Sequence, residues 1–163
     1  MGAARIRPAA AGDAGAVAAC VDAAYAVYVD RLGRKPAPML ADYGERIGQG
    51  RVSVAIEGQC AAVRGVLVLD AAADHLLIWN VAVDPAVQGR GLGRGLLAFA
   101  EEHAAGLGLP ELRPFTNELM HENGAFYAQL GYVETERRTE GPYRRVHMRK
   151  ALPNGGRSYA GDG

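Results

Sequence analysis

The feature that most constrains this chain is a cluster of glycine and arginine that follows an apolar segment. Residues 83–95 read VDPAVQGRGLGRG and hold four glycines and two arginines. An apolar run, Leu76 to Val83, leads into the cluster, and a helical pattern follows it. Glycine loses more conformational freedom on folding than any other residue, so a cluster of this density needs a structural reason. A strand, a glycine turn and a helix N-terminus in this order predict an anion-binding site.

Composition restricts how such an anion can be attracted. The chain has 163 residues, of which 49% are hydrophobic, and this suits one compact domain rather than two. Its 18 basic and 18 acidic residues balance, so the net charge gives no general attraction to nucleic acid or to an anionic membrane. Anion binding must therefore be local, and we expect no nucleic-acid partner and no membrane contact.

The ends of the chain and its cysteines bear on location and on metal binding. No apolar run approaches membrane-spanning length, and charges interrupt the Ala-rich start, so neither a transmembrane segment nor a signal peptide is predicted. We expect a cytoplasmic protein with one domain over residues 1–152 and a disordered, glycine-rich tail over residues 153–163. Cys20 and Cys60 lack metal-ligand spacing, so two free thiols and no metal site are expected.

Apolar periodicity predicts the order of the secondary structure. Intervals of three and four residues predict helices, and short β-branched runs between turns predict strands. Asp13 is the expected N-cap of the first helix. In chain order we predict a strand around Ile6, helices over 13–28 and 40–47, strands over 52–56, 61–69 and 76–83, a helix over 91–106, a strand over 112–116, a helix over 119–130, and strands over 132–136 and 143–148. The three strands within 52–83 are predicted to form an antiparallel meander.

The glycine spacing distinguishes between phosphate ligands. A dinucleotide fingerprint requires Gly-x-Gly-x-x-Gly, and counting from either Gly89 or Gly91 fails to give it. The lysine and hydroxyl residue that end a Walker loop are also absent. A different pattern, Gln-x-x-Gly-x-Gly, is met by Gln88 to Gly93.

Two segments resemble the GNAT superfamily of acetyl-CoA-dependent N-acetyltransferases. The stretch from Gln88 to Gly93 resembles that family's pyrophosphate loop, and residues 117–132, NELMHENGAFYAQLGY, resemble its second signature. The order of predicted elements is similar over roughly residues 4–151. The resemblance implies an α+β fold, a three-layer sandwich whose mixed, mostly antiparallel sheet has helices on both faces, and it implies acetyl-CoA as the cofactor.

The resemblance also implies which residues hold the cofactor. In that family the strand before the glycine loop splays from its neighbour, and its main chain binds the pantetheine arm. Val81 and Val83 would then supply main-chain contacts, and an amide near Val81 would polarise the thioester carbonyl. The cofactor-binding residues implied in this way are Val81, Ala82, Val83, Gln88, Gly89, Arg90, Gly91, Leu92, Gly93, Arg94, Asn117, Asn123 and Phe126.

The second signature implies an acid for the reaction. Asn123 and Tyr127 are four residues apart, so on a helix they share a face. In relatives the asparagine holds the pantetheine and the tyrosine stands near the sulfur, which implies that Tyr127 protonates the departing thiolate. The alternative is that Tyr127 only packs, with Phe126 as its neighbour.

The base is less well defined. An alkylammonium with a pKa of about 10.4 must lose a proton before it can attack. Some relatives carry a glutamate on the strand before the loop, where this chain has Trp79 and Asn80. We predict that Glu118 is a catalytic carboxylate that acts directly or through water. The alternatives that stay open are Glu111, His75 and His147.

The acceptor site is expected near the first helix and the loop after it. Tyr25 and Tyr28 are predicted to contact the acceptor, and Trp79 to form a wall of its pocket. Basic residues in the same segment would favour an acceptor that carries a carboxylate or phosphate. A solvated helix end with basic side chains explains the same sequence equally well.

The predicted function is transfer of an acetyl group from acetyl-CoA to a primary amine of a small molecule or peptide. Because no activated nucleophile is visible, we expect direct attack within a ternary complex. The alternative is a non-catalytic acyl-CoA-binding sensor or structural module, which the lack of an obvious base favours. Relatives are often dimeric, and this leaves a homodimer open.

Arginines near the end of the sequence raise the question of a nucleic-acid patch. Along residues 143–150, alternation places Arg145, His147 and Arg149 on one face of a strand. Val146 and Met148 fall on the other face. A solvated sheet face is the simpler interpretation, and the net charge of zero agrees with it.

Overall fold

The computed structural model describes residues 4–153, and within them the fold is α+β. Seven strands form a mixed, mostly antiparallel sheet in the order β1-β2-β3-β4-β5-β7-β6, accompanied by four α-helices. The chain divides into two compact units. The first runs to Leu69 and resumes over Trp79–Ala98, and the second contains Asp70–Ile78 and the chain from Phe99 onward.

The element bounds follow the predicted order. The first half contains β1 (Arg5–Pro8), α1 (Ala14–Leu32), α2 (Tyr43–Gly48), β2 (Val52–Glu57), β3 (Ala62–Ala71) and β4 (Leu76–Val83). The second half contains α3 (Leu92–Gly106), β5 (Glu111–Asn117), α4 (His121–Gln129), β6 (Val133–Glu140) and β7 (Tyr143–Ala151). Short 3₁₀ helices are η1 (Ala11–Asp13), η2 (Ala37–Leu40) and η3 (Pro85–Val87).

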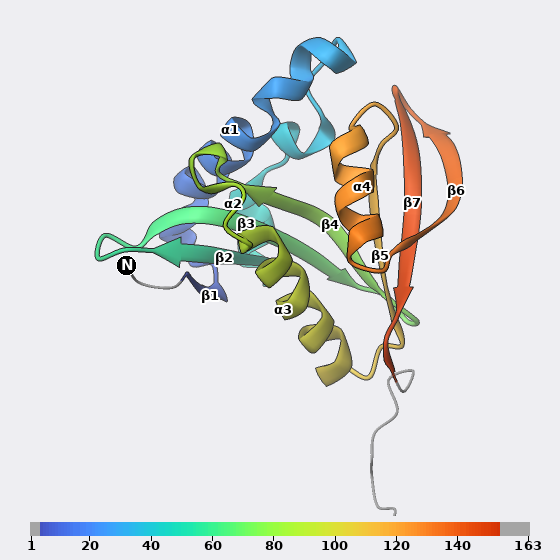
Figure 1. The fold of residues 1–163 in the computed structure, drawn as a ribbon. Coiled ribbons are helices and arrows are strands. Elements are labelled where there is room, and N and C mark those ends of the chain that lie inside the picture. The colour runs from blue at the N-terminus through green and yellow to red at the C-terminus, as the bar shows by residue number, and fades with distance from the viewer. Residues whose placement is uncertain (1–3, 154–163) are drawn as a thin grey trace, which may run out of the picture. The chain divides into compact units, whose positions relative to one another are not determined.

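In the first unit, β1, β2 and β3 lie side by side as an antiparallel group (Figure 1). Gly65 of β3 occupies a crowded position, since a Cβ there would lie 2.9 Å from Cδ1 of Leu96 and 3.2 Å from the Cβ of Ala55. Only glycine allows the start of α3 to approach the strand so closely. Apolar side chains with no exposed surface fill the core of this unit, among them Val17, Val21, Val54, Val66 and Leu67.

Strand β4 alternates between buried and partly exposed residues. Leu76, Ile78, Asn80 and Ala82 are buried, whereas the residues between them are partly exposed. Its first residues pair in parallel with β5, with Leu76 opposite Leu112. One face of β4 therefore belongs to the core, and a polar residue, Asn80, lies within that buried face.

In the second unit, β5, β7 and β6 form antiparallel ladders, and α4 packs against β5 (Figure 1). Val146 and Met148 of β7 are buried, while Arg145, His147 and Arg149 alternate with them and are not buried. This confirms the predicted alternation along β7.

Three local predictions differ from the structure. The helix predicted over 40–47 is divided into η2 and α2, because Ala41 and Asp42 adopt extended conformations between them and the Asp42 side chain accepts a hydrogen bond from Glu45 N–H at 3.0 Å. The helix predicted from 119 begins at His121, because Asn117 Oδ1 holds Leu119 N–H in a turn at 2.9 Å.

Asp13 occupies the predicted N-cap position of α1, but its side chain does not cap the helix. The carboxylate instead accepts the Ala10 N–H at 2.7 Å and pairs with Arg7 at 2.7 Å. The preceding 3₁₀ turn directs the carboxylate back toward β1. The Ala10 N–H and Arg7 therefore bind the carboxylate in place of the N–H groups of α1.

No helix within residues 4–153 is both long enough and apolar enough to cross a membrane. Most of the tail predicted over 153–163 lies outside the described residues. Cys20 is buried and Cys60 exposed, and both are free thiols, as expected. The assignment of residues 1–152 to one domain stays a prediction.

Candidate active site

The glycine loop between β4 and α3 adopts the backbone that its sequence predicts. Gly89 and Gly91 have φ angles of 85° and 81°, in the left-handed region that other residues rarely adopt. A Cβ on either would meet no atom within 4 Å, so backbone conformation rather than crowding requires glycine. Helix α3 begins at Leu92, and the N–H groups of its first turn have no acceptor within the helix. The loop therefore presents backbone donors beside the positive end of a helix dipole.

Asp84 holds the start of this loop. Its N–H donates to Arg64 O at 2.8 Å, and its carboxylate accepts the Ala86 N–H and an Arg64 N–H, each at 2.9 Å. The hydrogen bond from Ala86 and that from Arg64 lower the pKa of Asp84 below its usual range. Gln88, predicted to bind the cofactor, donates its side-chain amide to Val83 O at 3.3 Å. These contacts fix the direction in which the chain leaves β4.

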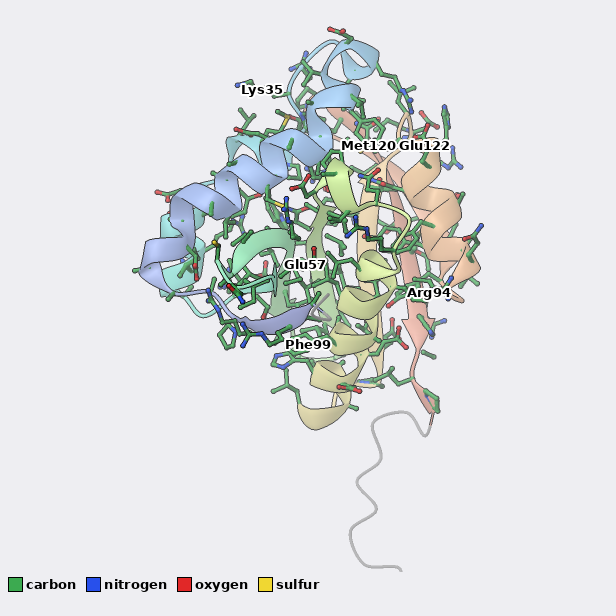
Figure 2. The ribbon with its side chains drawn as sticks, turned by 60° about the vertical axis from the view of Figure 1, so that its left-hand side comes forward. Lys35, Glu57, Arg94, Phe99, Met120 and Glu122 are labelled. Carbon is green, nitrogen blue, oxygen red and sulfur yellow. The ribbon has the colours of Figure 1, made fainter. Side chains whose placement is uncertain are left out.

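Two arginines accompany the loop, and both are exposed. The Arg90 guanidinium lies 3.7 Å from the carboxylate of Glu57, at the end of β2. Arg94 lies in the first turn of α3, and Figure 2 labels it together with Glu57. The long Arg90–Glu57 distance and the exposure of Arg90 make this a weak ion pair. An anion at the loop can therefore recruit Arg90 at little cost.

A buried polar network that the sequence did not reveal adjoins β4 in the first unit. The Tyr25 hydroxyl donates to Asn80 Oδ1 at 2.7 Å and to Val81 O at 3.3 Å. Asn80 in turn donates to the Tyr43 hydroxyl at 3.1 Å, and Tyr43 donates to Pro38 O at 2.6 Å. Burial raises the pKa of Tyr43 well above its ordinary value, so its hydroxyl keeps the proton that it donates. The network joins α1, α2 and the loop between them to β4.

The residues predicted to contact the acceptor have structural partners. Tyr25 and Tyr28 are both buried, and their rings lie 6.2 Å apart. The Arg31 guanidinium lies 5.0 Å from the centre of the Tyr28 ring. Trp79 is partly exposed, and the Arg46 guanidinium covers its indole at 3.8 Å. Their role toward an acceptor stays a prediction.

In the second unit, Tyr127 is a buried phenol on α4. Its side chain is 6% exposed and packs between Phe126 and Tyr132, with ring centres 5.8 and 5.5 Å away. Burial raises the pKa of Tyr127 well above its ordinary value. Within residues 4–153 its hydroxyl makes no hydrogen bond. Its hydroxyl oxygen is not among the buried unpaired atoms of the described residues, so the oxygen keeps some access to solvent although the ring is buried.

Asparagines shape the start of α4. Asn117 bonds to the Leu119 N–H, as described above. Asn123 donates from Nδ2 to Thr116 Oγ1 at 3.4 Å and approaches the sulfur of Met120, labelled in Figure 2, at 3.6 Å. Both contacts of Asn123 are long, and its acceptor oxygen is available to a ligand. As predicted, Asn123 and Tyr127 lie one turn apart on the same helix.

The four base candidates lie in different electrostatic surroundings. Glu118 accepts a hydrogen bond from Arg137 at 2.9 Å. Glu111 accepts one from Arg113 at 2.7 Å, which lowers the pKa of Glu111. Nδ1 of His75 lies 2.8 Å from the carboxylate of Asp74, which is 70% exposed. Nε2 of His147 lies 2.5 Å from Glu140.

The other cofactor residues predicted from the sequence lie in β4 and in the first turn of α3. Val81 and Val83 are partly exposed, Ala82 is 3% exposed, and Leu92 and Gly93 are partly exposed at the helix start. With Gly89 and Gly91 they form one continuous stretch of the first unit. The arrangement can bind a phosphate group through backbone donors and two cations.

Comparison with known proteins identifies the family. Residues 44–134 match a profile described as an acetyltransferase (GNAT) domain, and this span exceeds half of the chain. The chain therefore belongs to the GNAT acetyltransferase family. The match includes the glycine loop and the whole of α4.

Individual relatives are similar in sequence or in fold. A mycothiol acetyltransferase from a Nocardioides strain is 38% identical over 68 residues, which are 42% of this chain and 23% of that relative. A ribosomal-protein alanine N-acetyltransferase from Escherichia coli has a TM-score of 0.74 at 20% identity, covering 98% of this chain and 97% of its own. The paia N-acetyltransferase of Thermoplasma acidophilum, solved with coenzyme A, has a TM-score of 0.76 at 15% identity, covering 93% and 100%. The solved structures thus share the fold.

Proposed function

We propose that this protein transfers an acetyl group from acetyl-CoA to a primary amine of a small molecule or peptide, by direct attack within a ternary complex. Acetyl-CoA supplies the activated acetyl group, and GNAT acetyltransferases act on amines. The observation that carries the proposal is the glycine loop. Its left-handed glycines, open helix N-terminus and two arginines fit a pyrophosphate group.

The main chain of Val81 and Val83 is proposed to hold the amide-bearing arm of the cofactor. Both residues lie on the partly exposed face of β4. Hydrogen bonds to an extended strand bind amides without dependence on side-chain identity. Asn117, Asn123 and Phe126 are proposed to contribute from β5 and α4, where the asparagine side chain of Asn123 has an acceptor to offer.

Tyr127 is proposed to be the general acid. Burial keeps its phenol protonated throughout the neutral pH range, since it raises the pKa of Tyr127. An acid of this kind can protonate a departing thiolate as the carbon–sulfur bond breaks. The unpaired state of its hydroxyl within residues 4–153 supports this role.

Direct attack is favoured over a cysteine intermediate. Burial raises the pKa of Cys20 to about 11, so this thiol stays protonated and is a poor nucleophile. Cys60 lies in the exposed turn between β2 and β3, outside both motifs. The sensor alternative is not favoured, because the chain belongs to an acetyltransferase family. Acceptor contacts by Tyr25, Tyr28 and Trp79, a cytoplasmic location and a homodimer stay predictions.

The test is a thiol-release assay with acetyl-CoA and a panel of amines: spermidine, L-lysine and a peptide with a free N-terminus. The proposal expects amine-dependent release of coenzyme A, and a product heavier than the amine by one acetyl group in mass spectrometry. Acetyl-CoA binding without turnover on any amine would instead support a non-catalytic binder. Absence of both would contradict the whole assignment.

A further inference from the structure

A cation lies on an aromatic ring beside β4 in the first unit. The guanidinium carbon of Arg46, a residue of α2, lies 3.8 Å from the centre of the Trp79 indole. This is the distance of direct stacking, well inside the range of about 6 Å over which a cation and a ring attract each other. Both side chains are partly exposed, so the contact is made at the surface. A molecule from solvent can therefore reach the stacked pair.

The Arg46 guanidinium has no acceptor of its own. Its side chain makes no hydrogen bond and no ion pair within residues 4–153. The two nearest carboxylates in the sequence are engaged elsewhere, since Asp42 accepts the Glu45 N–H at 3.0 Å and Glu45 accepts a hydrogen bond from Gln49 at 3.5 Å. A guanidinium carries five N–H donors in one plane. Stacking covers the face of this plane and leaves the donors at its edge free to bind.

The buried network of β4 holds both members of the pair in place. Tyr43 lies three residues before Arg46 on the same side of α2, and Asn80 directly follows Trp79. The hydrogen bond from Asn80 to the Tyr43 hydroxyl, at 3.1 Å, therefore joins α2 to β4 next to the stacked pair. Both of these residues are buried, so water competes little for the bond. A guanidinium positioned in this way loses little freedom when it binds a ligand.

The charges around Arg46 suit an anion with a single charge. Burial raises the pKa of Tyr43, the charge of Arg46 opposes this rise, and the charge of Asp22 adds to it, so both charges act on the same hydroxyl. Asp22 is exposed and forms no ion pair with Arg46 among the described residues. A planar carboxylate matches the edge of a guanidinium through two parallel hydrogen bonds. With Asp22 nearby, a second negative charge on the ligand would be disfavoured.

The stacked pair adjoins the part of β4 that is proposed to hold the acyl group. Trp79 and Val81 are two residues apart, and both are partly exposed, in alternation with the buried residues of the strand. Two residues of a strand span about 7 Å. One small acceptor can therefore place a carboxylate on Arg46 and direct its amine toward the main chain of Val81. The guanidinium would then hold the part of the acceptor that does not react.

We propose that Arg46, stacked on Trp79, binds a carboxylate of the acceptor and so selects amines that also carry a carboxylate. The inference rests on the proposed acetyltransferase function and names the substrate class for it. Arg46 is a specificity-determining residue, and Trp79 positions its guanidinium. Neither side chain takes part in proton transfer or in the breaking of the carbon–sulfur bond. Amino acids meet the requirement, whereas polyamines do not.

The first experiment follows the fluorescence of Trp79, which is the only tryptophan of the chain. The probes are 5-aminopentanoate and its neutral analogue 5-aminopentanamide, titrated at constant ionic strength with coenzyme A present. Their amines have similar basicity, because the group that differs is remote from the nitrogen. In wild type we expect a saturable change with the carboxylate and about tenfold weaker binding of the amide. Arg46→Gln should bind both compounds equally. Equal binding by wild type, or no response at millimolar concentrations, would overturn the proposal.

The second experiment measures the same preference in turnover, as the ratio of kcat/KM for the carboxylate to kcat/KM for the amide. We expect a ratio of about ten in wild type and close to one in Arg46→Gln. Arg46→Lys should give an intermediate ratio, because lysine keeps the charge but lacks the planar fork. The loss should appear in KM for the carboxylate, with kcat little changed. Trp79→Leu should also lower the ratio, because the guanidinium loses the ring that holds it.

Arg34→Gln is the matched control. Arg34 is exposed in the loop between α1 and η2 and has no ion pair among the described residues, so this substitution removes the same charge from the same unit. The ratio should stay at its wild-type value. Equal losses in Arg34→Gln and Arg46→Gln would indicate a general effect of charge and overturn the proposed site.

The two proposals fail in different ways. A wild type that acetylates both compounds equally well overturns the role of Arg46 and leaves the acetyltransferase function intact. Selective binding of the carboxylate, reported by Trp79 without acetyl transfer to any amine, supports the carboxylate site and overturns the proposed function.

Discussion

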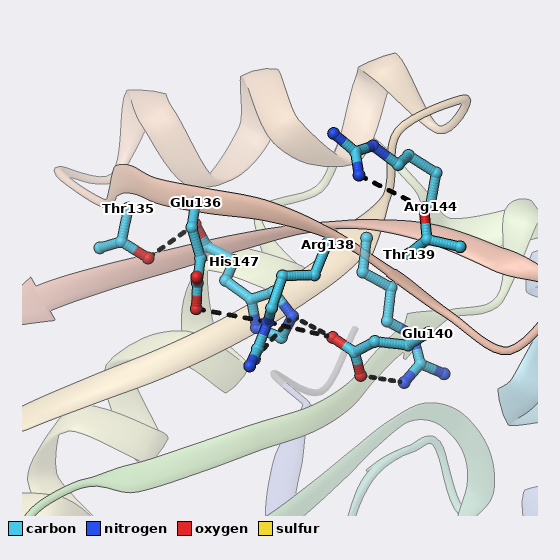
Figure 3. A network of polar contacts seen from close by, with 8 residues as sticks. Thr135, Glu136, Arg138, Thr139, Glu140, Arg144 and His147 are labelled. Carbon is cyan, nitrogen blue, oxygen red and sulfur yellow. Dashed lines mark hydrogen bonds and ion pairs between the residues drawn. The ribbon is translucent and has the colours of Figure 1, made fainter.

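The glycine loop and the charged face of β6 and β7 are two polar regions built on opposite principles. In the loop, Gly89 and Gly91 set the backbone, and backbone N–H groups are the atoms proposed to bind the cofactor. On the charged face of β6 and β7, side chains such as those of His147 and Glu140 make the polar contacts (Figure 3), and a bulge at Thr135 sets which side chains face one another. The first kind of site depends on local conformation, and the second depends on strand register.

Substitutions should therefore have different effects in these two regions. A backbone site tolerates changes of neighbouring side chains but not a loss of glycine or a reversal of charge. A side-chain site loses its chemistry when a single functional atom is removed, although binding of the donor substrate persists.

Removal of one oxygen from the buried phenol should have the largest effect. For Tyr127→Phe we expect kcat to fall by about 100-fold, because the general acid is lost while the ring still packs against Tyr132. The affinity for acetyl-CoA, measured by calorimetry, should change by less than about threefold. Equal losses in kcat and in affinity for acetyl-CoA would instead make Tyr127 a binding residue. Chemistry and cofactor binding would then not depend on separate residues.

The buried network on β4 should affect stability rather than chemistry. For Asn80→Ala we expect the free energy of unfolding in urea to fall by about 2 kcal/mol, because two buried hydrogen bonds are lost. The cost is limited because Tyr25 keeps Val81 O and Tyr43 keeps Pro38 O as acceptors. The double variant with Tyr25→Phe should lose less than the sum of the two single changes. Full additivity would mean that Asn80 and Tyr25 do not interact in solution.

The anchor of the glycine loop should give the smallest effect and a dependence on pH. For Asp84→Asn we expect a loss of about 1 kcal/mol at neutral pH, as for other capping carboxylates. The pKa of Asp84 is lowered in the folded state, so its stabilisation is present above the unfolded pKa of about 3.9 and is lost as pH falls through the folded pKa. Urea unfolding at several pH values should therefore show the two proteins converging in acid. A constant difference down to pH 2 would contradict this.

The sequence predicted the glycine loop well because its signals are local. The end of the strand, the glycine turn, the helix start and the nearby arginines all follow from a short run of residues. The alternation along β7 was likewise read correctly from its periodicity of two. The mistaken cap at Asp13 shows the limit of such signals, because a neighbouring N–H group and Arg7 compete for the same carboxylate.

What sequence reasoning missed depends on contacts between distant residues. The hydrogen bond between Tyr25 and Asn80 joins residues 55 positions apart, and no local pattern marks it. The position of Glu140 beside His147 depends on one extra residue, Thr135, in a strand whose residues are nearly all exposed. Strict alternation would have placed the charges of β6 on the wrong face. A bulge in a polar strand leaves no hydrophobic signal, because no buried side chain marks the change of phase.

We propose above that the backbone of the glycine loop binds the phosphates of acetyl-CoA. The most direct test is calorimetric titration of acetyl-CoA into wild type, Gly91→Glu and Gly50→Glu. Gly50 is a matched control, since its φ is 72° against 81° for Gly91 and neither has an atom within 4 Å of a Cβ. The account predicts micromolar binding by wild type and Gly50→Glu and a loss of more than about 100-fold, or 2.7 kcal/mol, for Gly91→Glu alone. Equal binding by all three proteins would contradict it.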